Sequence, residues 1–244
     1  MAVDKHINFF ELQKAAEKPG CPLCRIINDR AEMYIDNLLF EHVSDRTFRA
    51  LHRAAGGFCS YHSRNLVSFR DGLAVAILSR DLLDDRIISF EERKPWRPRG
   101  RCPICVERDR IEEEYLGFLA ESHGDTKEEQ ELRQIFTASD GLCAPHYSAL
   151  LFPRAGRGRW RERNRDGRRR GGERRGGMRI MGRSRTLPQW LTDFHDSKFR
   201  DLYGRVMQFI DFSAYGRKED FDSLSEQDQL VWKEAAAALR GAVD

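Results

Sequence analysis

The chain has 244 residues, of which 40% are hydrophobic and 33% charged, and its formal net charge is +3 at pH 7. This length suffices to bury one large core or two modest ones without a metal or disulfide to hold the fold together. No stretch approaches the roughly 20 apolar residues of a membrane-spanning helix, and no apolar signal segment opens the chain. We therefore expect a cytoplasmic protein without a membrane partner.

Helical periodicity dominates the first hundred residues. Apolar residues recur there at intervals of three and four, which is the period of a helix packed on a core. The pattern predicts four helices, over residues 5–17, 24–41, 48–55 and 62–87. The third is expected to stop at Gly56, and the linker 94–101, rich in Pro, Arg and Gly, closes the fourth.

The segment 154–186 differs in composition from the rest. Residues 154–185 contain fourteen arginines and three acids, a surplus of +11, so the remaining chain carries −8. With eight glycines and few apolar residues, this segment cannot bury enough surface to order itself, and we expect disorder. Its charge would bind any phosphate polymer, which makes nucleic acid a candidate partner through residues 154–185. An insertion or a shifted reading frame in GC-rich DNA would produce the same composition.

The last part of the chain returns to helical patterning. Apolar residues between Trp190 and Ile210 predict one amphipathic helix or a helix pair, and a final helix is expected from near the Ser223 and Ser225 caps to Gly241. No segment shows the alternation typical of a strand, so the predicted fold class is all-α.

A pair of cysteine motifs occurs twice. Each copy has a Cys-x-x-Cys followed some forty residues later by a Cys-x-x-His. The first copy contains Cys21, Cys24, Cys59 and His62, and the second contains Cys102, Cys105, Cys143 and His146. The copies also agree at helical core positions, with an offset of 81 residues that becomes 84 beyond a longer loop. This agreement indicates duplication of a whole structural unit.

The duplication predicts the domain organisation. Residues 1–100 would form the first helical repeat with its N-terminal helix, and residues 101–153 the second. Residues 187–244 would supply C-terminal helices that pack on both repeats.

The two motifs suit a tetrahedral metal site. A Cys-x-x-Cys on a tight turn and a Cys-x-x-His on one helical turn together supply Cys₃His, a common closed structural zinc site. A unit that was copied whole must have bound its own ion. We therefore expect one zinc ion in each repeat, held by Cys21, Cys24, Cys59 and His62 in the first and by Cys102, Cys105, Cys143 and His146 in the second.

Two other chemistries compete with zinc. An iron–sulfur cluster also uses cysteine ligands, although the multi-cysteine runs of ferredoxins are absent from the sequence. Redox thiols or disulfides would need a thioredoxin-like context or an oxidising compartment. Zinc, two ions per chain, is the favoured cofactor.

Other conspicuous residues indicate structure more than chemistry. Tyr34 and Tyr115 hold matching places on the predicted helices and are expected in the core or at its edge. Glu32 and Glu113 could support the ligating histidines, but they are expected to be solvated helix charges. The sequence has no Ser/His/Asp grouping and no glycine-rich phosphate loop after a strand, so it lends catalysis no support.

Beyond these patterns, the combination CPLCR, MYIDNLLFEHVSD, GFCSYH, DGLAVAILSRDLL, CPIC and GLCAPH resembles an uncharacterised bacterial family, a domain of unknown function. The resemblance covers about residues 5–152, and QFIDFSAYGRKEDF to VWKEAAAAL is similar to the family's closing region. Residues 154–185 depart from the pattern, where ordinary helical sequence is expected. The resemblance implies no activity, but it supports treating the eight Cys and His residues as one set.

We therefore expect a non-catalytic, zinc-binding helical scaffold or interaction protein whose protein partner the sequence does not name. An iron–sulfur or thiol redox protein is the first alternative. A nucleic-acid-binding protein that uses the Arg/Gly segment is the second.

Overall fold

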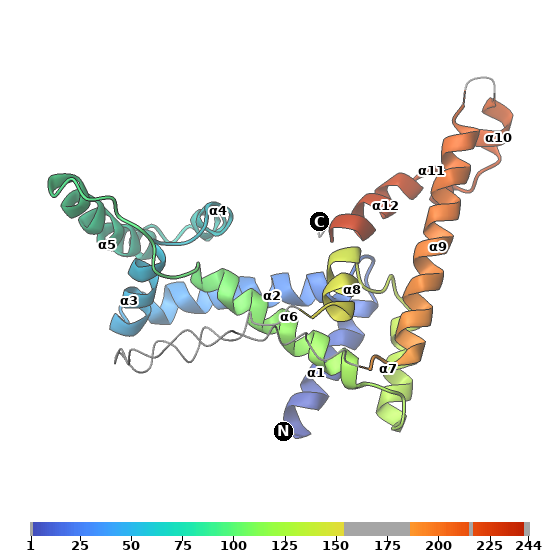
Figure 1. Cartoon of the computed structure of the whole chain (residues 1–244), viewed down its shortest axis with the longest axis horizontal. Coiled ribbons are helices and arrows are strands. Elements are labelled where there is room, and N and C mark those ends of the chain that lie inside the picture. Colours follow the sequence, from blue (N-terminus) through green and yellow to red (C-terminus); the bar gives the residue numbers. More distant parts are fainter. Residues whose placement is uncertain (1, 154–185, 215–216, 242–244) are drawn as a thin grey trace, which may run out of the picture. The chain divides into compact units, whose positions relative to one another are not determined.

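The computed structural model describes residues 2–153, 186–214 and 217–241, and every regular element within them is a helix (Figure 1). The all-α prediction is confirmed. The predicted disorder of the Arg/Gly segment concerns residues 154–185, which lie outside the described residues. The elements are α1 (Ala2–Ala16), α2 (Pro22–Asn37), the π-helical turn η1 (Leu38–His42), α3 (Arg46–Ala55), α4 (Ser60–Ser68), α5 (Gly72–Glu91), α6 (Pro103–Glu121), α7 (Lys127–Ala138), α8 (Ala144–Leu151), α9 (Gln189–Phe212), α10 (Lys218–Asp222), α11 (Glu226–Gln229) and α12 (Val231–Arg240).

The chain forms two compact units. One, here called the inserted unit, is Ile27–Glu112; the other, the terminal unit, combines Met1–Ile26 with Glu113–Asp244. This division differs from the predicted repeats 1–100 and 101–153. The reason is that α2 and α6 each pass from one unit into the other, so each unit takes parts of both repeats.

The inserted unit is built around α5, which packs against η1, α3 and α4. Its core consists of apolar side chains from these helices, from α2 and from the start of α6: Ala31, Ile35, Leu38, Leu39, Val43, Phe48, Leu66, Ala74, Leu78 and Ile104. The short helix α3 begins where Asp45 accepts a hydrogen bond from the Thr47 backbone N–H, and it ends at Gly56 in the left-handed conformation. The predicted stop at Gly56 is therefore confirmed.

The predicted helix over residues 62–87 is wrong as a single element. The structure has α4 and α5 in its place, and Arg70 between them has a left-handed φ of 59°. Asp71 then caps α5 by accepting a hydrogen bond from the Ala74 backbone N–H. The apolar period continues across the break because both helices pack on the same core, and periodicity alone misses the local cap.

The terminal unit is built around the long helix α9. Figure 1 shows α7 beside the first part of α9 and α10 beside its other end, and α9 also contacts α11 and α12. Helix α1 packs on α7, and α12 packs on α8. The largest fully buried side chains of this unit are Leu12, Leu23, Tyr115, Leu119, Leu132, Phe136 and Leu191. The C-terminal region is thus part of the core that surrounds α8.

None of the described helices combines the length and the apolar character needed to cross a membrane.

Candidate metal centres

The eight predicted ligands gather into two groups of four. The ligand atoms of Cys21, Cys24, Cys143 and His146, here called site 1, all lie within 4.8 Å of one another. His146 Nδ1 is 3.5 Å from Cys21 Sγ, 3.4 Å from Cys24 Sγ and 3.2 Å from Cys143 Sγ. The sulfurs of Cys24 and Cys143 are 3.7 Å apart. Site 1 lies wholly within the terminal unit.

Site 2 consists of Cys59, His62, Cys102 and Cys105, whose ligand atoms also lie within 4.8 Å of one another. His62 Nδ1 is 3.2 Å from Cys59 Sγ and 3.4 Å from the sulfurs of both Cys102 and Cys105. Cys59 Sγ and Cys105 Sγ are 3.8 Å apart. This site lies wholly within the inserted unit.

The grouping into two Cys₃His sets is as predicted, but the predicted pairing within each repeat is wrong. Each site combines the Cys-x-x-Cys of one repeat with the Cys-x-x-His of the other. The physical reason lies in α2 and α6, which start at one site and continue into the other unit. Each Cys-x-x-Cys is thereby carried away from the Cys-x-x-His that follows it in the sequence.

Helix starts place the ligands in both sites. Pro22 and Pro103 are the first residues of α2 and α6, so the first cysteine of each Cys-x-x-Cys stands just before a helix and the second lies in its first turn. Cys59 and Cys143 are the N-caps of α4 and α8, with nearly identical φ and ψ of −67° and 165° against −67° and 161°. The histidine three residues later then lies in the first turn, on the side of its cysteine.

The spacings fit one tetrahedral ion. With metal–sulfur and metal–nitrogen distances near 2.3 and 2.05 Å, the edges of a tetrahedron are about 3.8 Å between sulfurs and about 3.6 Å between sulfur and nitrogen. The S···S distances of 3.7 and 3.8 Å and the S···N distances of 3.2 to 3.5 Å come close to these values. A disulfide would need about 2.05 Å, and all six cysteines are free. The residues therefore fit a divalent ion.

Electrostatics also favour a cation at site 2. Burial and the negative charge of Cys102 raise the pKa of the Cys105 thiol to about 12. At Cys59, burial raises the thiol pKa. The backbone N–H groups of His62 and Tyr61 and the neighbouring thiols lower it by more than burial raises it, so the pKa of Cys59 is lowered overall. The helix start thus stabilises one thiolate, and a second needs compensating positive charge.

A glycine of the C-terminal helix covers site 1. Gly241 ends α12 with a left-handed φ of 69°. A Cβ atom at Gly241 would lie 2.8 Å from Cys24 Sγ and 3.0 Å from Cys143 Sγ. The backbone therefore approaches these sulfurs as closely as only glycine allows.

Asp140 joins the two chain segments that carry the ligands of site 1. Its carboxylate accepts a hydrogen bond of 2.7 Å from the Gly20 backbone N–H, just before Cys21. The other carboxylate oxygen is 3.3 Å from the Lys198 ammonium, which also donates to the Ser139 carbonyl at 2.7 Å. Helix α9 thereby holds the loop before Cys143 against the loop before Cys21.

His195 holds the same loop from inside the core. Its Nε2 accepts a hydrogen bond of 2.9 Å from the Leu142 backbone N–H, and its Nδ1 donates to the Leu191 carbonyl at 2.8 Å. Both contacts require the neutral ring, and burial lowers the pKa of His195. The ring of Tyr147 stacks on it with centroids 4.5 Å apart. His195 thus fixes the backbone next to Cys143.

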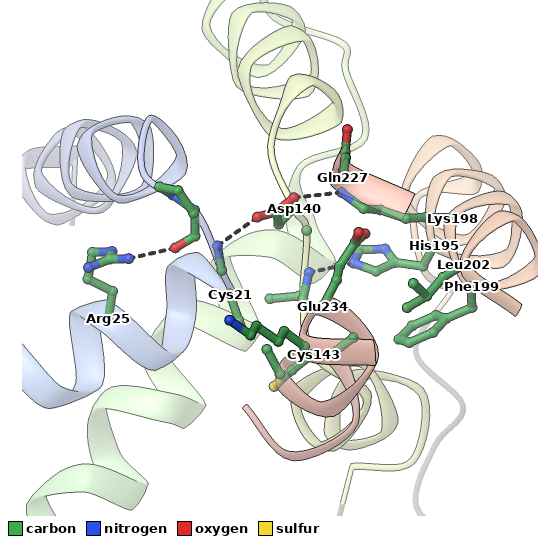
Figure 2. A pocket seen from close by; sticks show the side chains of 17 residues that line it. Cys21, Arg25, Asp140, Cys143, His195, Lys198, Phe199, Leu202, Gln227 and Glu234 are labelled. Atoms are coloured by element: carbon green, nitrogen blue, oxygen red, sulfur yellow. Dashed lines mark hydrogen bonds and ion pairs between the residues drawn. The ribbon is translucent and has the colours of Figure 1, made fainter. Parts of the chain in front are cut away.

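A cavity of about 420 Å³ adjoins site 1 and reaches Cys21 and Cys143. Figure 2 shows Asp140 between Lys198 and the backbone near Cys21, with His195 beside the loop that leads to Cys143. Arg25, on another wall of the cavity, donates to the Pro19 carbonyl at 2.6 Å. These polar contacts position the ligand-bearing loops around the cavity.

The other singled-out residues have the structural roles expected of them. Tyr115 is fully buried and donates a hydrogen bond to Glu11, while Tyr34 is half-buried at the edge of the inserted unit's core. Glu32 and Glu113 are exposed. Neither glutamate supports a site histidine by any hydrogen bond described in the structure.

Asp140 and His195 were not among the site residues predicted from the sequence. His195 follows Leu191 and Phe194 on the apolar side of a predicted helix, and a histidine in that position signals a buried, hydrogen-bonded ring. Asp140 carries no comparable signal, because its partner Gly20 is 120 residues away.

The fold and the two sites define an all-helical protein with two Cys₃His groups that could hold metal ions. Residues 5–95 match a family of unknown function (DUF6062), which confirms the predicted resemblance to such a family. The chain is also similar to an uncharacterized 23.9 kDa protein in the xynA 3' region of Caldicellulosiruptor sp. (strain Rt8B.4), with 32% identity over 136 residues. That match covers 54% of this chain and 65% of the relative, just under two thirds of its length. No solved structure matches the chain.

Proposed function

We propose that the protein binds two zinc ions, one in each Cys₃His site, and serves as a non-catalytic helical scaffold or interaction protein. The observation that carries this proposal is the tetrahedral spacing of three sulfurs and one imidazole nitrogen in both sites. Such a set fills all four positions around zinc and leaves none for a substrate. The ions would act on the fold by joining segments that lie far apart in the sequence.

The ligand spacing favours a single ion over an iron–sulfur cluster. Ligands on different irons of a cluster are separated by the iron–iron distance as well as by two iron–sulfur bonds. Here all four ligand atoms of each site lie within 4.8 Å of one another. Zinc is the usual ion for a closed tetrahedral set of thiolates and imidazole.

The proposed duplication has support in the backbone. In both copies a glycine with positive φ lies two residues before the cysteine, Gly57 with 93° in one copy and Gly141 with 65° in the other. A cysteine N-cap of nearly identical conformation follows in each. Two unrelated segments would have no reason to repeat this order.

Metal analysis with an anaerobic visible spectrum tests the proposal. We expect colourless protein with close to two zinc ions per chain, and we expect a strong chelator to reduce the helical circular dichroism. A brown preparation that absorbs in the visible would favour the cluster. Fully folded protein without metal would contradict the proposal.

The composition of residues 154–185 supports nucleic-acid binding as a second candidate function. Their surplus of +11 would release counterions from a phosphate backbone, and Trp160 offers a ring for base stacking. Deleting residues 154–185 should then abolish salt-sensitive binding to a single-stranded oligonucleotide. Unchanged affinity after the deletion would exclude the segment as the cause.

A further inference from the structure

Both sites consist of three cysteines and one histidine, but they differ in which of these side chains is exposed to solvent. In site 1 the three cysteines are buried, with Cys143 exposed by 2% and Cys21 and Cys24 by 7% each, while His146 is partly exposed. In site 2 the three cysteines are partly exposed, whereas His62 is buried at 2%. Site 1 therefore presents its imidazole to solvent, and site 2 presents its sulfurs.

This difference decides which site an oxidant can reach. Sulfur is the oxidisable ligand, and its susceptibility follows thiolate character and exposure. Gly241 lies against two sulfurs of site 1 at a distance that leaves no room even for a methyl group. The cavity beside site 1 reaches Cys21 and Cys143, but these sulfurs stay buried, whereas the three cysteines of site 2 are partly exposed. A small peroxide therefore reaches the sulfurs of site 2 more readily.

The second ring nitrogen of the site 2 histidine also bears on how firmly that site holds an ion. His62 Nε2 is buried and has no hydrogen-bond partner among the residues that the structure describes. A ligating histidine normally donates this N–H to a carboxylate or a carbonyl, which fixes the ring and strengthens the metal bond. Without such a partner, the ring resists loss of the ion less.

We propose that site 2 is an oxidant-sensitive zinc site, in which a hydroperoxide converts Cys59 and Cys105 to a disulfide and releases the ion, while site 1 keeps its zinc. The inference rests on the proposed binding of zinc at both sites. Cys59 Sγ and Cys105 Sγ are already 3.8 Å apart and need to approach to about 2.05 Å.

The chemistry balances with hydrogen peroxide as the oxidant. One thiolate attacks peroxide, the O–O bond breaks, and a sulfenic acid forms as hydroxide leaves. The second thiolate attacks the sulfenic sulfur, the S–S bond forms and a second hydroxide leaves. The two sulfurs lose two electrons, peroxide becomes two waters after taking two protons, and Zn²⁺ loses two of its four ligands.

Zinc release from the full chain tests the inference. Zinc-loaded protein is treated with hydrogen peroxide in the presence of a chromogenic zinc chelator. We expect one equivalent of zinc to appear at least about tenfold faster than the second. Peptide mapping after the fast phase should find Cys59 joined to Cys105 and the cysteines of site 1 as free thiols, and dithiothreitol should restore zinc binding.

Two matched variants assign the phases. Cys24→Ser with Cys143→Ser leaves only site 2 and should release zinc at the fast rate. Cys59→Ser with Cys105→Ser leaves only site 1 and should release it at the slow rate. Equal rates for the two equivalents of the unmodified chain, or faster release from site 1, would overturn the inference. Protein without zinc before the oxidant is added would instead contradict the proposed function.

Discussion

At the scale of single residues, Gly241 shows how a backbone position far from the motifs enters a candidate metal site. Its left-handed φ of 69° ends α12, and its Cα faces the sulfurs of Cys24 and Cys143. Gly124 also has a left-handed φ, of 94°, but nothing lies within 4 Å of the position where its Cβ would be. The two glycines share the conformation and differ in the sulfur contact.

Substituting these glycines separates the two effects. Gly124→Ala should lower the free energy of unfolding by about 1 kcal/mol and leave zinc affinity unchanged, because only the left-handed conformation is penalised. Gly241→Ala carries the same penalty and also displaces two ligand sulfurs, so it should weaken zinc binding at site 1. Chelator competition with the zinc-loaded protein measures the difference. Equal zinc affinities in both variants would show that Gly241 does not support the site.

At the scale of elements, two ion pairs with the same spacing join α3 to α5. Arg49 binds Asp81 through Nε at 2.6 Å and Nη2 at 2.5 Å, and Arg53 binds Asp85 in the same two-pronged way. The Asp81 side chain is 5% exposed and that of Asp85 is 19% exposed. If the carboxylate is lost, water can therefore replace it less well at the Arg49–Asp81 pair than at the Arg53–Asp85 pair.

Neutralising each aspartate should have unequal effects. Asp81→Asn leaves the Arg49 guanidinium facing a buried neutral amide and should lower the free energy of unfolding by about 2 kcal/mol. Asp85→Asn should cost less than about 1 kcal/mol, because water replaces the more exposed carboxylate. Urea denaturation of the zinc-loaded protein near pH 7 measures both. A larger loss for the Asp85 variant would contradict the role of burial.

The same pair has a defined pH dependence. The hydrogen bond from Arg49 lowers the pKa of Asp81 to about 2 against its burial, which raises it. A carboxylate with a lowered pKa stabilises the fold fully above its unfolded pKa of about 3.9, and that stabilisation disappears as the pH falls toward 2. The difference in stability between the parent protein and Asp81→Asn should therefore be constant above about pH 5 and shrink below pH 4.

Helix α9 stabilises site 1 through His195, which accepts from the Leu142 N–H. His195→Phe removes that acceptor from a buried donor and should cost about 1–3 kcal/mol at pH 8. Burial lowers the pKa of His195, so its neutral form persists in the fold while the unfolded chain takes up a proton below about pH 6.5. The parent protein thus loses stability below pH 6.5 in a way that the variant does not.

The difference in free energy of unfolding between the parent protein and His195→Phe should consequently become smaller as the pH falls from 8 to 5.5. Urea denaturation measures it. His123→Phe is the matched control, since His123 is exposed and should change stability little at either pH. A gap that widens on acidification would contradict a buried, neutral His195.

At the scale of the whole molecule, the sites exchange ligands between the two repeats. Site 1 joins residues 119 to 125 positions apart, and site 2 joins the Cys-x-x-His of the first repeat to Cys102 and Cys105, 40 and 43 positions from His62. An ion bound in either site would therefore tie both repeats together. Neither repeat holds a complete set of four ligands for one site by itself.

Paired substitutions distinguish this exchange from pairing within each repeat. Cys24→Ser with Cys143→Ser removes two ligands of site 1 and should leave one zinc per chain. Cys24→Ser with Cys59→Ser removes one ligand from each site and should leave none bound tightly. Pairing within repeats predicts the reverse. The zinc content of each variant after gel filtration decides between the two pairings. Both variants lack two cysteines, so a difference in zinc content reflects which cysteines were removed.

The sequence by itself determined the all-helical class and which eight Cys and His residues gather into the two groups, because spacing within a motif and apolar periodicity are local properties. It also placed the stops at Gly56 and Gly241, where a left-handed residue ends a helix. The sequence did not predict the helix break at Arg70, because the apolar pattern continues from α4 into α5.

Only the tertiary structure decided which motifs share a site. The spacing of Cys21 and Cys24 is compatible with either Cys-x-x-His, and the choice depends on where α2 and α6 carry the chain. The same holds for Asp140, whose partner Gly20 is distant in the sequence, and for the exposure of the sulfurs in site 2. These properties arise from packing between distant segments, which no local pattern of residues encodes.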